Sequence, residues 1–190
     1  MSAFLGFIHH LMWQKINFTN SLAEEVIKDF ENVESAREEI DALGTLETGE
    51  LSEIIDTFNI HGWLADRVEL VEERLAKAVE MYLKDKDIES LKVKFFEKGK
   101  SENFKGSKSE AYALVSSKFL DGMPCDGSIT VLSDEDDVEF VVYKDVHADI
   151  WNKYAGVETY WTLRDEFVRG VLNGKYTLEK RDNIYSIRGW

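Results

Sequence analysis

Apolar residues recur at helical spacing through the first half of the chain. The longest stripe runs over residues 60–84, where apolar side chains return every three or four positions after Asn59, a favourable N-cap. Residues 3–17 repeat the same spacing. The pattern therefore predicts two long amphipathic helices, each of which buries one face.

Between these helices the sequence carries start and stop signals. Ser21 opens the segment S-L-A-E, whose serine and glutamate have the spacing of a capping box. Gly44 suits the left-handed residue that ends many helices. We therefore expect a separate helix from Ser21 to about Leu43, a loop over 44–49 and a short helix over 50–57.

Beyond residue 85 the helical spacing gives way to alternation in two places. The segments S-I-T-V-L at 128–132 and V-E-F-V-V-Y at 138–143 are rich in β-branched and aromatic residues, and a polar run separates them, which indicates a hairpin. A second hairpin is predicted for K-Y-T-L-E-K and I-Y-S-I-R near residue 190. The helices expected in this half are 87–104, 108–120, 147–154 and 158–172.

Together these elements predict an α+β fold. An N-terminal antiparallel helical half, residues 1–85, would pack on a C-terminal half, residues 86–190, that contains a four-stranded antiparallel sheet and helices. No proline- or serine-rich linker separates the halves, and the only proline is Pro124. We therefore expect two closely packed domains.

Composition narrows the choice of partners. The formal net charge is −14, and an acidic surface repels the phosphates of nucleic acids and anionic membranes, so we expect no nucleic acid and no membrane partner. A single cysteine allows no internal disulfide and fits a reducing compartment. We expect a cytoplasmic, soluble protein, and a homodimer stays open as an alternative to a monomer.

Three of the four histidines lie in two similar stretches, F-I-H-H-L-M-W at 7–13 and F-N-I-H-G-W at 58–63. If the two helices pack with these ends level, His61 approaches His9 or His10. Neutral imidazoles together with a carboxylate could then hold a divalent metal or another histidine-ligated cofactor. Helical metal spacing such as H-x-x-x-H is absent, so packed or capping histidines are the alternative.

The same stretches carry Trp13 and Trp63. These side chains would either form the wall of an aromatic pocket or belong to the core. Gly62 costs helix stability relative to alanine. It would permit the close approach of a ligand or, as we prefer, tight packing against a tryptophan.

The only cysteine, Cys125, lies in the segment D-G-M-P-C-D-G at 121–127. Cys125 and His147 flank the first hairpin and could form a nucleophile–base dyad, in which Asp126 or Asp149 orients the imidazole. Neighbouring aspartates disfavour the thiolate. A buried, inert thiol is therefore the alternative.

The helix at 158–172 contains two cations close to acidic residues. Arg164 and Arg169 could clamp a carboxylate ligand. They could equally form ion pairs within the helix or between the halves, because Asp165 and Glu166 lie beside them in sequence.

The element order of the second half resembles a known domain. A hairpin, a short helix, a longer helix ending F-V-R-G-V-L and a hairpin ending Y-S-I-R are similar to the small-molecule-binding domain of the 4-vinyl reductase type and its relatives, which include aminothiazoline carboxylate hydrolases. The resemblance covers at most the last 70 residues or so. It implies a hydrophobic ligand pocket between sheet and helices.

The chain departs from that family in its cysteines. The family typically carries several around the pocket and near the final strand, whereas here Tyr185 and Ser186 occupy the final strand and only Cys125 remains. The resemblance therefore transfers no catalytic residue.

These observations favour a small-ligand-binding or sensor-like protein with a pocket at the interface of the two halves. The alternatives are a hydrolase that uses Cys125 with His147 or a histidine-bound metal, and an acidic protein-interaction module. Whether the protein is an enzyme stays open at this point. The predicted lining consists of His9, His10, Trp13, His61, Trp63, Cys125 and His147.

Overall fold

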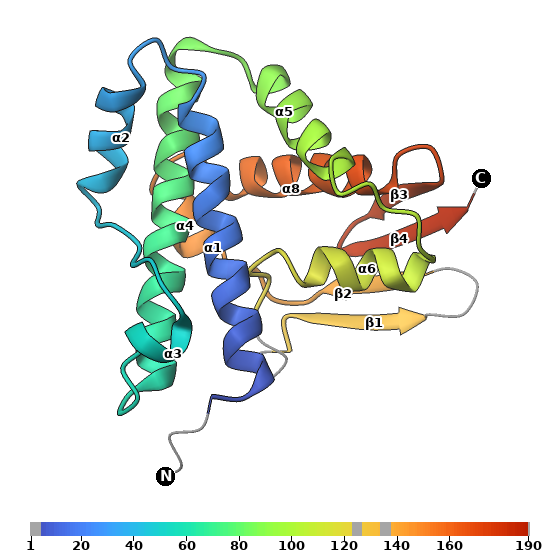
Figure 1. The fold of residues 1–190 in the computed structure, drawn as a ribbon. Coiled ribbons are helices and arrows are strands. Elements are labelled where there is room, and N and C mark those ends of the chain that lie inside the picture. The colour runs from blue at the N-terminus through green and yellow to red at the C-terminus, as the bar shows by residue number, and fades with distance from the viewer. Residues whose placement is uncertain (1–4, 123–126, 134–137, 190) are drawn as a thin grey trace.

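The computed structural model describes residues 5–122, 127–133 and 138–189. Helices form its N-terminal part, and a four-stranded antiparallel sheet lies in its C-terminal part (Figure 1), which confirms the predicted α+β class. None of the helices in the described ranges has both the length and the hydrophobicity that crossing a membrane requires.

Two long helices dominate the N-terminal part. They are side by side and run in the same direction, because Trp13 contacts Trp63 near their beginnings and Phe30 contacts Tyr82 near their ends. The chain returns between them through two shorter helices. In chain order the four helices are α1 (Phe7–Ile27), α2 (Val33–Asp41), α3 (Leu51–Ile54) and α4 (Ile60–Asp85).

α1 continues through Ser21, so the helix start predicted there is wrong. The Ser21 hydroxyl donates to the carbonyl of Phe18 one turn earlier, at 2.7 Å, instead of capping a new helix. Glu24 is directed towards α4, where it forms an ion pair with Arg74 at 3.1 Å. The break comes later, and Asn32 provides the side-chain cap of α2.

The C-terminal part contributes four further helices, and local caps begin two of them. Asp87 accepts the N–H of Ser90 at the start of α5, and Ser107 forms a capping box with Glu110 at the start of α6. The helices are α5 (Ile88–Lys100), α6 (Lys108–Ser116), α7 (Ala148–Trp151) and α8 (Val157–Leu172).

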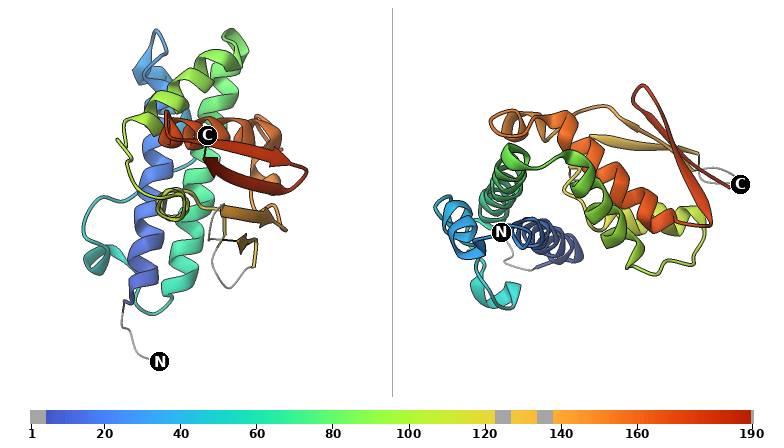
Figure 2. Two further views of the ribbon diagram at one scale, coloured as in Figure 1. Left: turned by 90° about the vertical axis from the view of Figure 1, so that its right-hand side faces the viewer. Right: turned by 90° about the horizontal axis from the view of Figure 1, so that it is seen from above.

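Both predicted hairpins form, and they join into one sheet. Its strands are β1 (Ile129–Ser133), β2 (Val138–Val142), β3 (Tyr176–Arg181) and β4 (Ile184–Gly189), in the spatial order β1-β2-β4-β3. β2 and β4 pair at the centre, where Phe140 is opposite Tyr185 and their rings stack at 5.1 Å. Helices cover one face of the sheet (Figure 2).

The two halves share their main hydrophobic core. Buried side chains run from Leu22 of α1 and Tyr82 of α4 through Phe167 of α8 to Ile187 of β4. A second, smaller cluster fills the space between the beginnings of α1 and α4 and includes Trp13 and Trp63.

α5 and α8 cross at a pair of glycines. A Cβ at Gly99 would collide with the carbonyl oxygen of Phe167, and a Cβ at Gly170 would collide with that of Phe96. The two backbones therefore touch, and this contact holds α8 in the position from which it supplies side chains to the interior.

Candidate functional site

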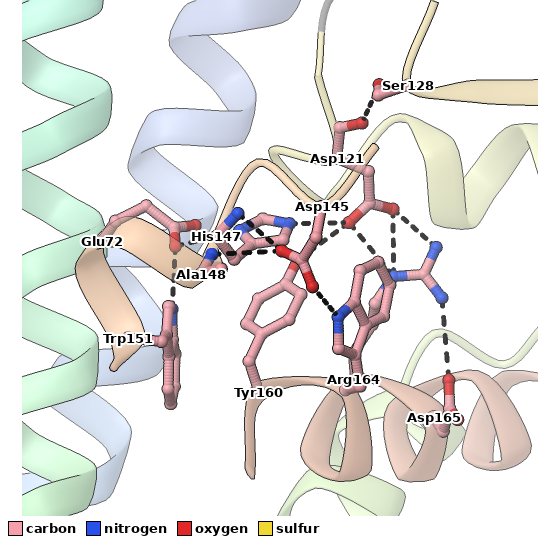
Figure 3. Close-up of polar contacts among 11 residues, drawn as sticks. Glu72, Asp121, Ser128, Asp145, His147, Ala148, Trp151, Tyr160, Arg164 and Asp165 are labelled. Carbon is pink, nitrogen blue, oxygen red and sulfur yellow. Dashed lines mark hydrogen bonds and ion pairs between the residues drawn. The ribbon is translucent and has the colours of Figure 1, made fainter. Parts of the chain in front are cut away.

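A tight turn after β2 carries the one buried histidine of the described residues. Asp145 accepts the backbone N–H groups of His147 and Ala148, at 2.9 and 3.1 Å, with one carboxylate oxygen. Its other oxygen accepts the indole N–H of Trp161 at 2.7 Å. Three hydrogen bonds thus orient the turn and direct the His147 ring inward (Figure 3).

His147 lies between two carboxylates. Its Nδ1 is 3.1 Å from Oε2 of Glu72, and its Nε2 is 3.4 Å from Oδ1 of Asp121. The second distance is long for a hydrogen bond, so that contact is mainly electrostatic. The ring stacks on Tyr160 with a centroid separation of 3.7 Å, and only 1% of its surface is exposed.

Asp121 joins this histidine to α8. Its carboxylate accepts the hydroxyl of Tyr160 at 2.8 Å and the guanidinium of Arg164, whose Nε and Nη2 lie 2.9 and 2.5 Å from Oδ2. Ser128 donates to the main-chain carbonyl of Asp121 at 2.6 Å. Glu72, His147, Asp121 and Arg164 therefore form an alternating chain of charges, which we call the buried ionic chain.

Electrostatic interactions within the buried ionic chain determine the protonation of His147 and Asp121. Burial by itself lowers the pKa of His147, but the carboxylates of Glu72 and Asp121 outweigh it and raise that pKa to about 9. Burial opposes ionisation of Asp121, yet Arg164 and His147 hold its pKa well below the usual range. At neutral pH His147 is therefore an imidazolium, which cannot accept a proton as a general base.

A cleft of about 580 Å³ opens beside this chain, between α4 and the segment that leads into α7. Glu72 and His147 line it, so the buried ionic chain borders the cleft, while Glu69 and Asp149 line it as exposed acids. His61 is also part of the lining. The apolar lining consists of Met12, Leu64, Ala65, Val68, Leu120, Val146 and Ile150.

The hydrogen bonds to the Glu72 carboxylate involve only one of its two oxygens. Its Oε2 accepts from both His147 and the indole N–H of Trp151, the latter at 2.8 Å. No residue in the described part of the chain donates a hydrogen bond to Oε1. No lysine or arginine is part of the cleft lining. The free oxygen belongs to a carboxylate that is 3% exposed and borders the cleft.

A wider groove of about 720 Å³ lies elsewhere, between α2 and the end of α4. Its lining mixes acids with Lys77, Lys84 and Lys86, and Lys86 contacts the rings of Phe30 and Tyr82. No member of the buried ionic chain borders it, so we place the candidate site at the smaller cleft.

The structure brings His9 and His61 together, because the beginnings of α1 and α4 pack side by side at the same level. Their Nε2 atoms are 3.3 Å apart. The backbone N–H of Gly6 donates to Nδ1 of His9, so the proton of the neutral ring is on Nε2 and can be shared with His61. The arrangement therefore favours a hydrogen-bonded pair over two metal ligands.

His10 does not join this pair, and its side chain is exposed. Within residues 5–122, 127–133 and 138–189, no group of three or more histidine, cysteine, aspartate or glutamate side chains is arranged to hold a metal ion. The predicted metal site of His9, His10 and His61 therefore finds no third ligand among these residues.

Trp13 and Trp63 pack against each other with ring centroids 5.5 Å apart and are buried in the smaller core cluster. They do not line the cleft, so they act as core residues. Gly62 is also explained locally, because a Cβ there would collide with the side chain of the Asn59 cap. The three atoms nearest to that Cβ all belong to Asn59, so the preferred explanation, packing against a tryptophan, stays a prediction.

Of the predicted lining, the cleft contains His61 and His147. Cys125 lies outside the described residues, so its place relative to His147 stays a prediction. Both ring nitrogens of His147 face carboxylates.

The sequence analysis did not identify Glu72 and Asp121 as the partners of His147. Glu72 falls on the buried stripe of α4, next to Val71 and one turn before Leu75, and a charged residue on an apolar stripe was the available signal. Asp121 was considered only as an acidic neighbour of Cys125 in the segment 121–127. Of the ion pairs expected within the helix, Arg169 binds Glu166 at 2.9 Å and Arg164 lies 3.8 Å from Asp165, but the main partner of Arg164 is Asp121, which was not predicted.

Comparison with known proteins yields no relative. No family model matches the chain, and no curated protein or solved structure is detectably similar to it. The function is therefore inferred from the geometry of the site alone.

Proposed function

We propose that the protein binds a small molecule with an apolar body and a cationic amino group in the cleft between α4 and the segment leading into α7. The observation that carries the proposal is Oε1 of Glu72, which accepts no hydrogen bond from the described residues and belongs to a carboxylate that borders an apolar cleft. A buried carboxylate gains most from a cationic donor.

The size and charge of the cleft support the same ligand class. About 580 Å³ falls within the range of sites for small ligands. Its apolar walls fit a hydrocarbon body, and the exposed acids Glu69 and Asp149 would attract a cation to the entrance. An anionic ligand would meet three carboxylates in this lining and one cation, the His147 imidazolium, whose ring nitrogens already face Glu72 and Asp121.

The hydrolase alternative draws less support from the site. His147 is an imidazolium at neutral pH, and its ring nitrogens are directed to Glu72 and Asp121. We therefore propose binding rather than hydrolysis. The resemblance to the 4-vinyl reductase type of domain and the role of an interaction module stay predictions that nothing in this site favours.

Binding can be tested with a matched pair of probes, phenethylamine and phenethyl alcohol, by isothermal titration calorimetry. The amine should bind and the alcohol should bind at least about tenfold more weakly, since a charge-assisted hydrogen bond contributes roughly 1.5–3 kcal/mol. If neither probe binds, or both bind equally, the assignment to a cationic ligand is wrong.

Two tryptophan variants locate the binding site. Ala65→Trp places a large side chain in the cleft at an exposed position of α4, so it should abolish amine binding without unfolding the protein. Val93→Trp, at a position of α5 that is 63% exposed and away from the cleft, is the control and should bind as the parent does. Unchanged binding by Ala65→Trp would place the ligand elsewhere.

A further inference from the structure

Lys15 lies in the middle of α1 and is buried. Only 7% of its surface is exposed. It forms no hydrogen bond or ion pair with any residue of the described ranges. Lysine is almost never buried without a partner, because the ammonium group loses its hydration. Most of the Lys15 side chain is therefore removed from water, while its amine is not among the described atoms that are both fully buried and without a hydrogen bond.

The Lys15 side chain borders a pocket of about 270 Å³ between α1, α6 and the beginning of β1. Ile8, Leu11 and Ile129 give this pocket apolar walls. Met12 and Gly122 line both this pocket and the larger cleft, so the two sites are neighbours with separate chemistry. The pocket is large enough for a molecule of a few heavy atoms.

The surroundings of Lys15 favour the neutral amine. Burial lowers its pKa, Asp121 raises it to a smaller extent, and Arg164 lowers it further. Asp121 is already bound by Arg164 and the Tyr160 hydroxyl, so it offers the amine no close ion pair. A neutral, desolvated lysine amine is a nucleophile, and such lysines form Schiff bases with carbonyl compounds.

Asp121 and three residues with hydroxyl groups also line the pocket, and one of these hydroxyls, that of Ser128, donates to the backbone carbonyl of Asp121. Tyr112 and Ser116 of α6 line it, and neither side-chain hydroxyl hydrogen-bonds to another side chain or backbone group in the part of the chain that the structure describes. They are available to hydrogen-bond to a carbonyl oxygen. We propose that this pocket is a carbonyl-binding site in which the Lys15 amine forms an imine with a small apolar aldehyde.

The reaction balances without a further reactant. The Lys15 nitrogen lone pair attacks the carbonyl carbon, the carbonyl oxygen takes up a proton, and a carbinolamine forms. Loss of the hydroxyl group with one proton from nitrogen releases water and leaves the C=N bond. No oxidant or reductant is consumed, and the step is reversible. The proposal does not depend on the amine ligand of the neighbouring cleft.

Reductive trapping tests this site on the full-length chain. Propanal and sodium cyanoborohydride are added at neutral pH, and the propylated lysines are located by peptide mass spectrometry. Lys15 should be modified faster than the exposed Lys105, because burial lowers the pKa of Lys15 and a lowered pKa raises the neutral fraction of an amine. Its rate should saturate with propanal, whereas that of Lys105 should rise linearly.

Adjacent substitutions provide the control. Ile8→Trp reduces the pocket and should slow the trapping of Lys15, whereas Phe7→Trp, at a neighbouring position that is 81% exposed and outside the pocket, should leave it unchanged. Lys15→Met should remove the rapid phase. Equal rates at Lys15 and Lys105, or a Lys15 rate that ignores Ile8→Trp, would overturn the proposal.

Discussion

His147 illustrates how two carboxylates override burial. Isolated in the interior it would be neutral, but between Glu72 and Asp121 its pKa rises to about 9. The charged histidine in turn helps Arg164 to hold the pKa of Asp121 below its usual range. The buried ionic chain is therefore a unit whose members depend on one another, and its protonation contributes to stability.

The pH dependence of stability follows from this shift. A histidine whose pKa rises on folding contributes stability that is complete below the unfolded value of 6.5 and is lost as the pH rises through about 9. Between these values the free energy of unfolding should fall by up to about 1.4 kcal/mol per pH unit. Urea unfolding at a series of pH values measures this slope, and His147→Gln should flatten it. An equal slope in the variant would assign the dependence to another group.

The buried amine of Lys15 is expected to destabilise the protein, in contrast to the charged imidazole of His147. Lys15→Met keeps the length of the stem and removes a buried amine without a partner, so it should raise the free energy of unfolding by about 1 kcal/mol. Lys105→Met, at an exposed position, should change it by less than about 0.5 kcal/mol. Chemical denaturation measures the free energy of unfolding of both variants. A lower value for Lys15→Met than for the parent would show that the amine has a stabilising partner.

At the scale of elements, the sequence predicted helices and strands well where local signals agree. Asn59 caps α4 as expected, accepting the N–H of Gly62 at 3.2 Å, and the alternating segments form the strands of the sheet. The error at Ser21 has a local cause. Its hydroxyl bonds back to Phe18 while the buried stripe of α1 continues, so burial outweighed a capping signal.

The crossing of α5 and α8 could not be predicted, because glycines in a helix do not reveal which backbone approaches them. Gly170→Ala should destabilise the protein by about 1–3 kcal/mol through overpacking, although alanine is the better helix former. Val93→Ala on the exposed face of α5 is the control and should be nearly neutral. Thermal unfolding compares them, and a neutral Gly170→Ala would mean that the helices separate easily.

For the molecule as a whole, the site depends on contacts between distant parts of the sequence. The level packing of α1 and α4 brought His9 to His61, an outcome that the sequence could only offer as one alternative. The cleft could not be predicted from the packing of these two helices alone, because Glu72 and His147, which line it, are 75 residues apart in the sequence. This cleft lies between the two halves, where a pocket was predicted, but its role as a ligand pocket stays a prediction, and most of its lining was not foreseen.

If the cleft beside Glu72 takes a cationic ligand, such a ligand should perturb the residues that line the cleft. Phenethylamine should be titrated into ¹⁵N-labelled protein while amide chemical shifts are recorded. We expect the largest changes at Ala65, Val68 and Ile150, which line the cleft, and no such changes in Ala65→Trp. Changes confined to the groove around Phe30 and Tyr82, or no changes at all, would contradict the account.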